Sequence, residues 1–219
     1  MSSTFRPPTP PPDQEAHMPT PWTLDPDRVF SPEPNVRARA RDLYASIAEL
    51  PIIAPHGHVE PSLLADPNAR FGNPAELFII PDHYVFRMLF SHGIPMESLG
   101  VPRKDGGPVE TDPRTIWRTF CKHFHLFRGT PTALWLKAEL VELFDVAVTP
   151  SLETADATYD MIDAELKSDA FTPRALFERF GVETLATTDP AAGDLNLHAQ
   201  MQAEGLPVIP TFRPDATMN

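Results

Sequence analysis

The chain has 219 residues, which is enough to bury a full core in one domain or a little more. Apolar residues make up 42% and charged residues 22% of it, ordinary values for a soluble globular protein. The formal net charge of -12 repels phosphate backbones and anionic lipid, so we expect no nucleic acid and no membrane among its partners. A small anionic substrate stays compatible with this charge, because it feels the local field of its pocket.

The first 22 residues are rich in proline and lack apolar periodicity. Such a composition cannot pack a core, so we expect a disordered or polyproline-like tail over residues 1–22. A ligand for a proline-reading domain is one interpretation, and a dispensable extension is the favoured one. No later stretch approaches 18 apolar residues and no signal peptide is recognisable, so we expect a cytoplasmic protein.

Ordered structure is predicted from about Trp22, beginning with a helix over residues 36–50. Asn35 is its expected N-cap, and apolar residues recur in it every three to four positions. The apolar run 50–55 follows and is typical of a short strand buried on both faces, as in a parallel sheet. This strand ends at the polar segment 56–58.

Residues 74–180 have an almost wholly helical pattern. We expect helices at 74–79, 82–93, 112–126, 130–144, 153–167 and 172–180. Thr130 before Pro131 is typical of an N-cap followed by proline at the first helical position. The chain therefore carries a long helical segment after its first strand.

Apolar strand patterns return at 184–188 and at 207–212. The helical pattern at 194–204 between them predicts a parallel strand–helix–strand unit. The fold class is then α/β: the N-terminal part of a (β/α)8 TIM barrel. Its start is expected in 23–73, a large helical insertion in 74–180, and the second and third strands in 181–219. Three parallel strands cannot close a barrel, so we expect the barrel to be incomplete in this chain.

His56-Gly57-His58 is the sharpest chemical signal in the sequence. In an extended chain residues i and i+2 point to the same side, so both imidazoles can reach one metal ion. Two hydrogen-bonded loop histidines are the alternative for a bare His-x-His. The position directly after a buried strand favours the metal site.

His123 and His125 repeat the same spacing within a helical pattern. Positions i and i+2 lie about 200° apart around a helix, so we interpret these two as ordinary helix residues. Cys121, the only cysteine, lies in the same pattern and excludes an intramolecular disulfide. A buried structural thiol is favoured there over a catalytic one.

Polar residues follow the other two strands as well. Asp189 follows the second strand and can be a functional group or ordinary turn chemistry before Pro190. Arg213 ends the third strand, and its planar fork suits a carboxylate ligand or a salt bridge to Asp215. In parallel barrels the active site lies at the carboxyl ends of the strands.

His83 and Tyr84 stand side by side after an apolar run. They can offer an acid/base pair or two oriented hydrogen bonds to a polyol. Without other information, surface residues at a helix start are the better interpretation.

Together these segments resemble the uronate (glucuronate) isomerase family, which belongs to the amidohydrolase superfamily of metal-binding (β/α)8 barrels. The resemblance runs in order from about residue 22 to the last residue. It is carried by six segments: 51–58, 71–77, 82–87, 127–131, 187–190 and 210–215.

This resemblance implies an aldose–ketose isomerisation, of D-glucuronate to D-fructuronate and of D-galacturonate to D-tagaturonate. It implies that His56 and His58 are ligands of a divalent metal, with zinc expected. It makes His83 and Tyr84 catalytic, substrate-contacting residues, with Tyr84 a candidate for proton movement between C1 and C2. Arg213 is implied to bind the substrate carboxylate. The partner is a small sugar acid, and a homo-oligomer of the full-length enzyme is compatible with the sequence.

The sequence departs from the family in two ways. Gly57 stands where many members have cysteine, which is not expected to disturb ligation. The family chain is roughly twice as long, and its metal-binding aspartate at the end of the eighth strand has no counterpart here. We therefore expect the 219-residue chain alone to be inactive, a prediction that fructuronate formation by it would contradict. Two alternatives stay open: another metal-dependent hydrolase of the superfamily, and a non-catalytic fragment or pseudogene product.

Overall fold

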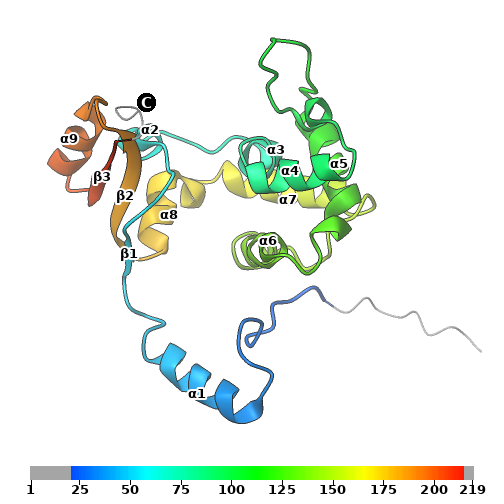
Figure 1. Cartoon of the computed structure of the whole chain (residues 1–219), viewed down its shortest axis with the longest axis horizontal. Coiled ribbons are helices and arrows are strands. Elements are labelled where there is room, and N and C mark those ends of the chain that lie inside the picture. Colours follow the sequence, from blue (N-terminus) through cyan, green and yellow to red (C-terminus); the bar gives the residue numbers. More distant parts are fainter. Residues whose placement is uncertain (1–20, 215–219) are drawn as a thin grey trace, which may run out of the picture.

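The computed structural model describes residues 21–214 and has a small parallel sheet at one end and a group of helices at the other (Figure 1). The strands are β1 (Ile52–Ala54), β2 (Val182–Pro190) and β3 (Val208–Arg213), in the order β1-β2-β3. Both strand pairs are parallel. The helix α9 (Asn196–Ala203) connects β2 to β3, so the predicted strand–helix–strand unit is confirmed.

The segment between β1 and β2 is helical, as predicted. Its α-helices are α2 (Pro61–Ala65), α3 (Pro74–Phe78), α4 (His83–Ser91), α5 (Pro113–His123), α6 (Pro131–Glu142), α7 (Ala155–Leu166) and α8 (Pro173–Arg179). Three short 3-10 turns accompany them: η1 (Met96–Leu99), η2 (Phe124–Phe127) and η3 (Asp169–Phe171). The sequence analysis missed α2 and η1, which are too short for a helical period to be visible. Within residues 21–214 no helix is both long and apolar enough to span a membrane.

Proline, unusually frequent here with 27 residues, has a clear role at helix starts. Six of the described helices begin at a proline. At this position the missing N–H has no helical partner to lose, and the fixed φ suits the helix. Thr130 caps α6 by accepting from the N–H of Ala133 at 3.1 Å, which confirms the predicted cap.

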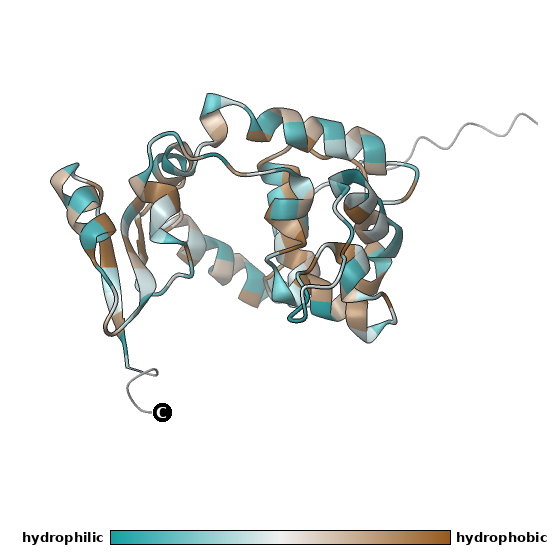
Figure 2. Cartoon of the chain, turned by 90° about the horizontal axis from the view of Figure 1, so that it is seen from above, coloured by the Kyte–Doolittle hydropathy of each residue, from teal (hydrophilic) through white to brown (hydrophobic). Residues whose placement is uncertain are grey.

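Two separate apolar clusters hold the chain together. The larger one lies within the helical part, and hydrophobic residues gather where these helices face one another (Figure 2). The smaller one lies beneath the sheet and includes Leu64, Phe177, Leu185, Met201 and Val208. Burial of apolar surface in both is the main stabilising contribution. The sheet therefore has its own support from α2, α8 and α9.

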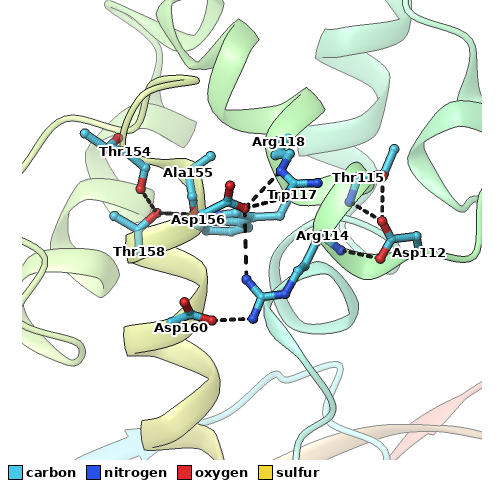
Figure 3. Close-up of polar contacts among 10 residues, drawn as sticks. All are labelled: Asp112, Arg114, Thr115, Trp117, Arg118, Thr154, Ala155, Asp156, Thr158 and Asp160. Carbon is cyan, nitrogen blue, oxygen red and sulfur yellow. Dashed lines mark hydrogen bonds and ion pairs between the residues drawn. The ribbon is translucent and has the colours of Figure 1, made fainter.

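The helices α5 and α7 are joined by both buried and exposed contacts (Figure 3). Trp117, fully buried, donates its indole N–H to the carbonyl of Ala155 at 3.0 Å. Around it, Arg118 pairs with Asp156 at the surface. Exposed ion pairs of this kind contribute little, so the buried indole is the stronger link.

Two predictions for the first elements are wrong. The helix α1 (Pro34–Ala45) begins two residues before the predicted range 36–50 and ends five residues before its end. Its N-cap is Glu33, whose carboxylate accepts from the N–H of Val36 at 2.8 Å. Asn35 lies inside the helix, because Pro34 is already suited to the first helical position. None of the residues of α1 is buried.

The strand β1 is not buried on both faces. Its residue Ile53 is 63% exposed. Among the described residues only β2 pairs with β1, so one edge and much of the strand surface stay open. An apolar run in the sequence indicates that a segment favours burial. Whether the segment is buried depends on other elements that pack against it.

Candidate functional site

The two histidines after β1 converge on one point. The Nε2 atoms of His56 and His58 are 3.0 Å apart, and the ring centroids are 4.8 Å apart. Two nitrogens that bind one zinc ion at about 2.0–2.1 Å in tetrahedral geometry lie about 3.4 Å from each other. The observed distance also suits an imidazole N–H donating to the other ring. The predicted approach of the side chains is thus observed, and their role as ligands stays a prediction.

The pair offers part of a metal site. Within residues 21–214, no group of three or more His, Cys, Asp or Glu side chains is arranged to hold a metal ion. Imidazole nitrogen is a preferred zinc ligand, and the pair can occupy two adjacent positions of a tetrahedral site. The described residues therefore fit zinc at two positions out of four.

An apolar pocket of about 460 Å³ opens beside His58. Its walls include Leu63, Phe71 and Phe177, and also Pro81. Because Pro81 directly precedes Asp82, the pocket joins the surroundings of His58 to the start of α4. Two segments that the sequence analysis singled out separately thus border one pocket.

The start of α4 holds His83 and Tyr84 in a fixed arrangement. Asp82 caps the helix by accepting from the backbone N–H of Tyr84 at 2.8 Å. The rings of His83 and Tyr84 have centroids 4.3 Å apart, and Tyr84 packs edge-on against Trp135 of α6 at 5.5 Å. Tyr84 is 57% exposed, so a ligand can reach it. Their predicted proximity is observed, and their contact with substrate stays a prediction.

Glu139 on α6 is a candidate that the sequence analysis missed. Together with Asp82 it lines a second cavity of about 170 Å³, whose walls are mostly apolar. Burial, reinforced by the negative charge of Asp82, raises the pKa of Glu139 to about 7. A carboxyl group with such a pKa can hold or release a proton near neutral pH. In the sequence it is one of the two acidic residues of α6, and only the cavity distinguishes it.

The carboxyl ends of β2 and β3 lie side by side, with Asp189 opposite Phe212 and Pro190 opposite Arg213. Arg213 is exposed there, and its backbone carbonyl accepts from the N–H of Ala191 at 3.1 Å. The predicted gathering of polar strand-end residues at one edge is therefore observed. Asp215, the alternative partner of Arg213, lies outside the described residues.

Asp189 takes part in a buried network with Thr187 and His198. The hydroxyl of Thr187 donates to Oδ2 of Asp189 at 2.6 Å and lies 2.8 Å from Nε2 of His198. Because the single hydroxyl proton goes to Asp189, His198 donates from Nε2 to the hydroxyl oxygen. Nδ1 of His198 has no hydrogen-bond partner within residues 21–214. The network ties β2 to α9, which favours a structural role for Asp189.

The remaining candidates are Cys121 and the second histidine pair, His123 and His125. Cys121 is buried, and burial raises the pKa of its thiol to about 12, so it is neither reactive nor ionised at neutral pH. The rings of His123 and His125 have centroids 6.2 Å apart, farther than those of the first histidine pair. Both results agree with the expectations from the helical pattern.

Comparison with known proteins gives a consistent result. The family model for glucuronate isomerase matches residues 35–219. The uronate isomerases of Nostoc punctiforme and Rhizobium meliloti are each 52% identical to this chain, over 197 and 198 residues. In both cases the match covers 90% of this chain and 42% of the relative, so the chain spans less than half the length of these relatives.

Solved structures resemble this fold as well. The crystal structure of glucuronate isomerase from Caulobacter crescentus matches with a TM-score of 0.85 and 46% identity. That of uronate isomerase from Thermotoga maritima matches with a TM-score of 0.77 and 28% identity. Each match covers 90% of this chain and 41% of the other.

Proposed function

The chain belongs to the glucuronate isomerase family, and from this premise we propose that it serves the aldose–ketose isomerisation of a uronate. The observation that carries the proposal is the pair His56 and His58, whose Nε2 atoms are 3.0 Å apart after β1 in a chain matched by that family over residues 35–219. The substrates proposed are D-glucuronate and D-galacturonate.

We assign the histidine pair to a divalent metal, with zinc the proposed ion. A bound cation would supply positive charge beside the oxygen atoms of the substrate. The convergence of the two imidazoles and the preference of zinc for nitrogen ligands support this assignment. Among residues 21–214 no third ligand accompanies the pair. The remaining ligands would therefore come from outside these residues.

The other proposed roles follow from the chemistry of the reaction. Isomerisation removes the proton at C2, passes through an enediol and delivers a proton to C1. Tyr84, which is exposed next to His83, is proposed to move this proton, and His83 to hydrogen-bond the sugar. Arg213 is proposed to bind the substrate carboxylate through its planar fork.

We propose that β1, β2 and β3 are the first three strands of a (β/α)8 barrel with the helical insertion after β1. The parallel order β1-β2-β3 supports this assignment, as does the position of α9 between β2 and β3. Polar residues at the carboxyl ends of the strands also agree with the location of active sites in such barrels.

The test is a chimera in which this chain replaces the matching part of the Caulobacter crescentus relative. The chimera is expected to convert D-glucuronate to a ketose, followed by NMR, and to incorporate solvent deuterium through the enediol. His56→Ala and His58→Ala are expected to abolish turnover. Tyr84→Phe is expected to lower kcat, and Arg213→Lys to raise KM by about 10- to 100-fold.

The outcomes separate the candidate functions. A chimera with the circular dichroism of the relative but without isomerisation would contradict the proposal. Hydrolysis of simple amides or lactones in its place would favour a metal-dependent hydrolase.

A further inference from the structure

The loop that carries the histidine pair is tied to β2 by one side chain. Thr188 donates its hydroxyl hydrogen to the backbone carbonyl of Gly57 at 2.7 Å. These residues are 131 positions apart in the sequence. Gly57 lies between His56 and His58, so the bond acts on the peptide that joins the two candidate ligands.

The bond lies beyond the end of the regular strand pairing. The register of β1 with β2 ends at Ala54 opposite Leu185. Pro55 follows and has no N–H to continue the ladder. The hydroxyl of Thr188 therefore provides an attachment where the backbone alone cannot.

Gly57 is also packed closely against the same strand. A Cβ atom at this position would lie 3.1 Å from the carbonyl oxygen of Ala186 and 3.1 Å from Cδ1 of Leu185. The absence of a side chain thus lets the loop approach β2. That close approach brings the Gly57 carbonyl within reach of Thr188.

Because Gly57 is a glycine, the loop needs this hydrogen bond to hold one backbone conformation. Glycine has access to more backbone conformations than any other residue, and a rotation at Gly57 would turn the ring of His58 away from that of His56. A hydrogen bond to the Gly57 carbonyl restricts this rotation. It thereby favours the arrangement in which the two Nε2 atoms are 3.0 Å apart.

We infer that Thr188 is a positioning residue for the His56/His58 pair: its hydroxyl fixes the Gly57 peptide so that both imidazoles converge. The role of this hydrogen bond in metal binding rests on the proposed function, whereas its effect on the conformation of the loop does not. Thr188 is not itself one of the proposed metal ligands. Partners that orient metal ligands typically change metal affinity by about 10- to 100-fold when they are removed.

The experiment compares three variants of the full 219-residue chain. Thr188→Val removes the hydroxyl at nearly constant shape, and Thr188→Ser keeps it. Thr184→Val is the matched control, since Thr184 lies on the same face of β2 but opposite Ile53 in the strand ladder. Thermal melts by circular dichroism verify that each variant is folded.

Two readouts are used. The first is the backbone 15N order parameter of Gly57 and His58 in the metal-free chain. We expect a value near that of rigid backbone, about 0.85, to fall below about 0.6 in Thr188→Val only. The second is calorimetric titration with Zn²⁺, in which we expect about tenfold weaker binding by Thr188→Val and recovery by Thr188→Ser.

Unchanged order parameters in Thr188→Val would overturn the inference. Unchanged Zn²⁺ affinity would also overturn it, provided that the parent chain binds Zn²⁺ more tightly than a His56→Ala/His58→Ala variant. If the parent chain binds no better than that variant, the proposed metal role fails, and the order parameters alone decide the role of Thr188.

Discussion

Nε2 of His56 faces Nε2 of His58 across 3.0 Å, at the point where β1 gives way to a loop. The same chain contains a second His-x-His, at His123 and His125, whose ring centroids are 6.2 Å apart. The two pairs differ in their backbone: His56 and His58 lie in the loop after β1, whereas His123 ends α5 and His125 lies in η2, and helical positions i and i+2 point to different sides. The chain thus provides its own comparison for metal binding.

We predict that Zn²⁺ binding depends on the first pair and not on the second. Replacement of His56 or His58 by alanine should weaken binding by at least about tenfold, because a single imidazole loses the chelate arrangement. The variant His123→Ala/His125→Ala should bind as the parent chain does. Calorimetric titration measures both, and equal losses in the two sets would show that Zn²⁺ binds to histidines in general.

Arg174 of α8 is predicted to be important for stability, since it joins three helices. Its guanidinium donates to the carbonyls of Leu64 at 2.7 Å and Ala65 at 2.9 Å, and it also pairs with Glu204. Arg174→Lys should lower the free energy of unfolding by about 1–3 kcal/mol, because lysine cannot serve both carbonyls in one plane. Urea denaturation measures this change.

The control for Arg174 is Arg70, which pairs with Asp169 at 2.8 Å. Asp169 is almost fully exposed, so Arg70→Lys should leave the unfolding midpoint nearly unchanged. Equal effects of the two substitutions would mean that the carbonyl contacts of Arg174 contribute nothing beyond a surface ion pair.

The sequence predicts the helices and strands of this fold better than it predicts which of them are buried. Helix starts such as Thr130-Pro131 depend on local chemistry, which short sequence patterns report directly. The burial of β1 was predicted wrongly, because Ile53 is apolar but has few neighbours in the described part of the chain. Burial is a long-range property that a local pattern does not contain.

In the candidate site, too, local features could be predicted from the sequence and long-range contacts could not. The His-x-His spacing predicts the approach of His56 to His58, and the structure brings the two rings together in the loop after β1. Thr188, Glu139 and His198 were not found, because each acts through contacts with residues far away in the sequence or through burial in a cavity. The family resemblance adds chemical roles to residues, but it does not reveal these supporting contacts.

Trp117 gives a prediction for the helical part. Trp117→Phe removes the indole N–H that bonds the carbonyl of Ala155, and it also leaves a cavity in the larger core cluster. We expect a loss of about 2–3 kcal/mol in the free energy of unfolding. The loss should persist in 1 M NaCl, since neither the lost hydrogen bond nor the cavity depends on the screening of charges by salt.

Trp135→Phe is the matched control, because Trp135 is partly exposed on α6. Its cost should be smaller than that of Trp117→Phe. If high salt abolished the effect at Trp117, the surrounding ion pairs, such as Arg118 with Asp156, would be the dominant link between α5 and α7.

Glu139 should make the stability of the chain depend on pH in a direction opposite to that of an ordinary paired carboxylate. Burial raises its pKa from an ordinary 4.5 to about 7, so the folded chain keeps a proton that the unfolded chain has already released. The associated stability is present below about pH 4.5 and is lost as the pH rises through 7. The upper limit of this contribution is about 3 kcal/mol, from 1.36 kcal/mol per pKa unit.

Glu139→Gln should flatten the profile of unfolding free energy between pH 5 and 8, whereas Glu142→Gln, on the exposed side of the same helix, should not. Urea denaturation across this range measures both variants. A Glu139→Gln profile as steep as that of the parent chain would show that Glu139 is ionised in the folded chain at pH 5, and that its cavity is open to water.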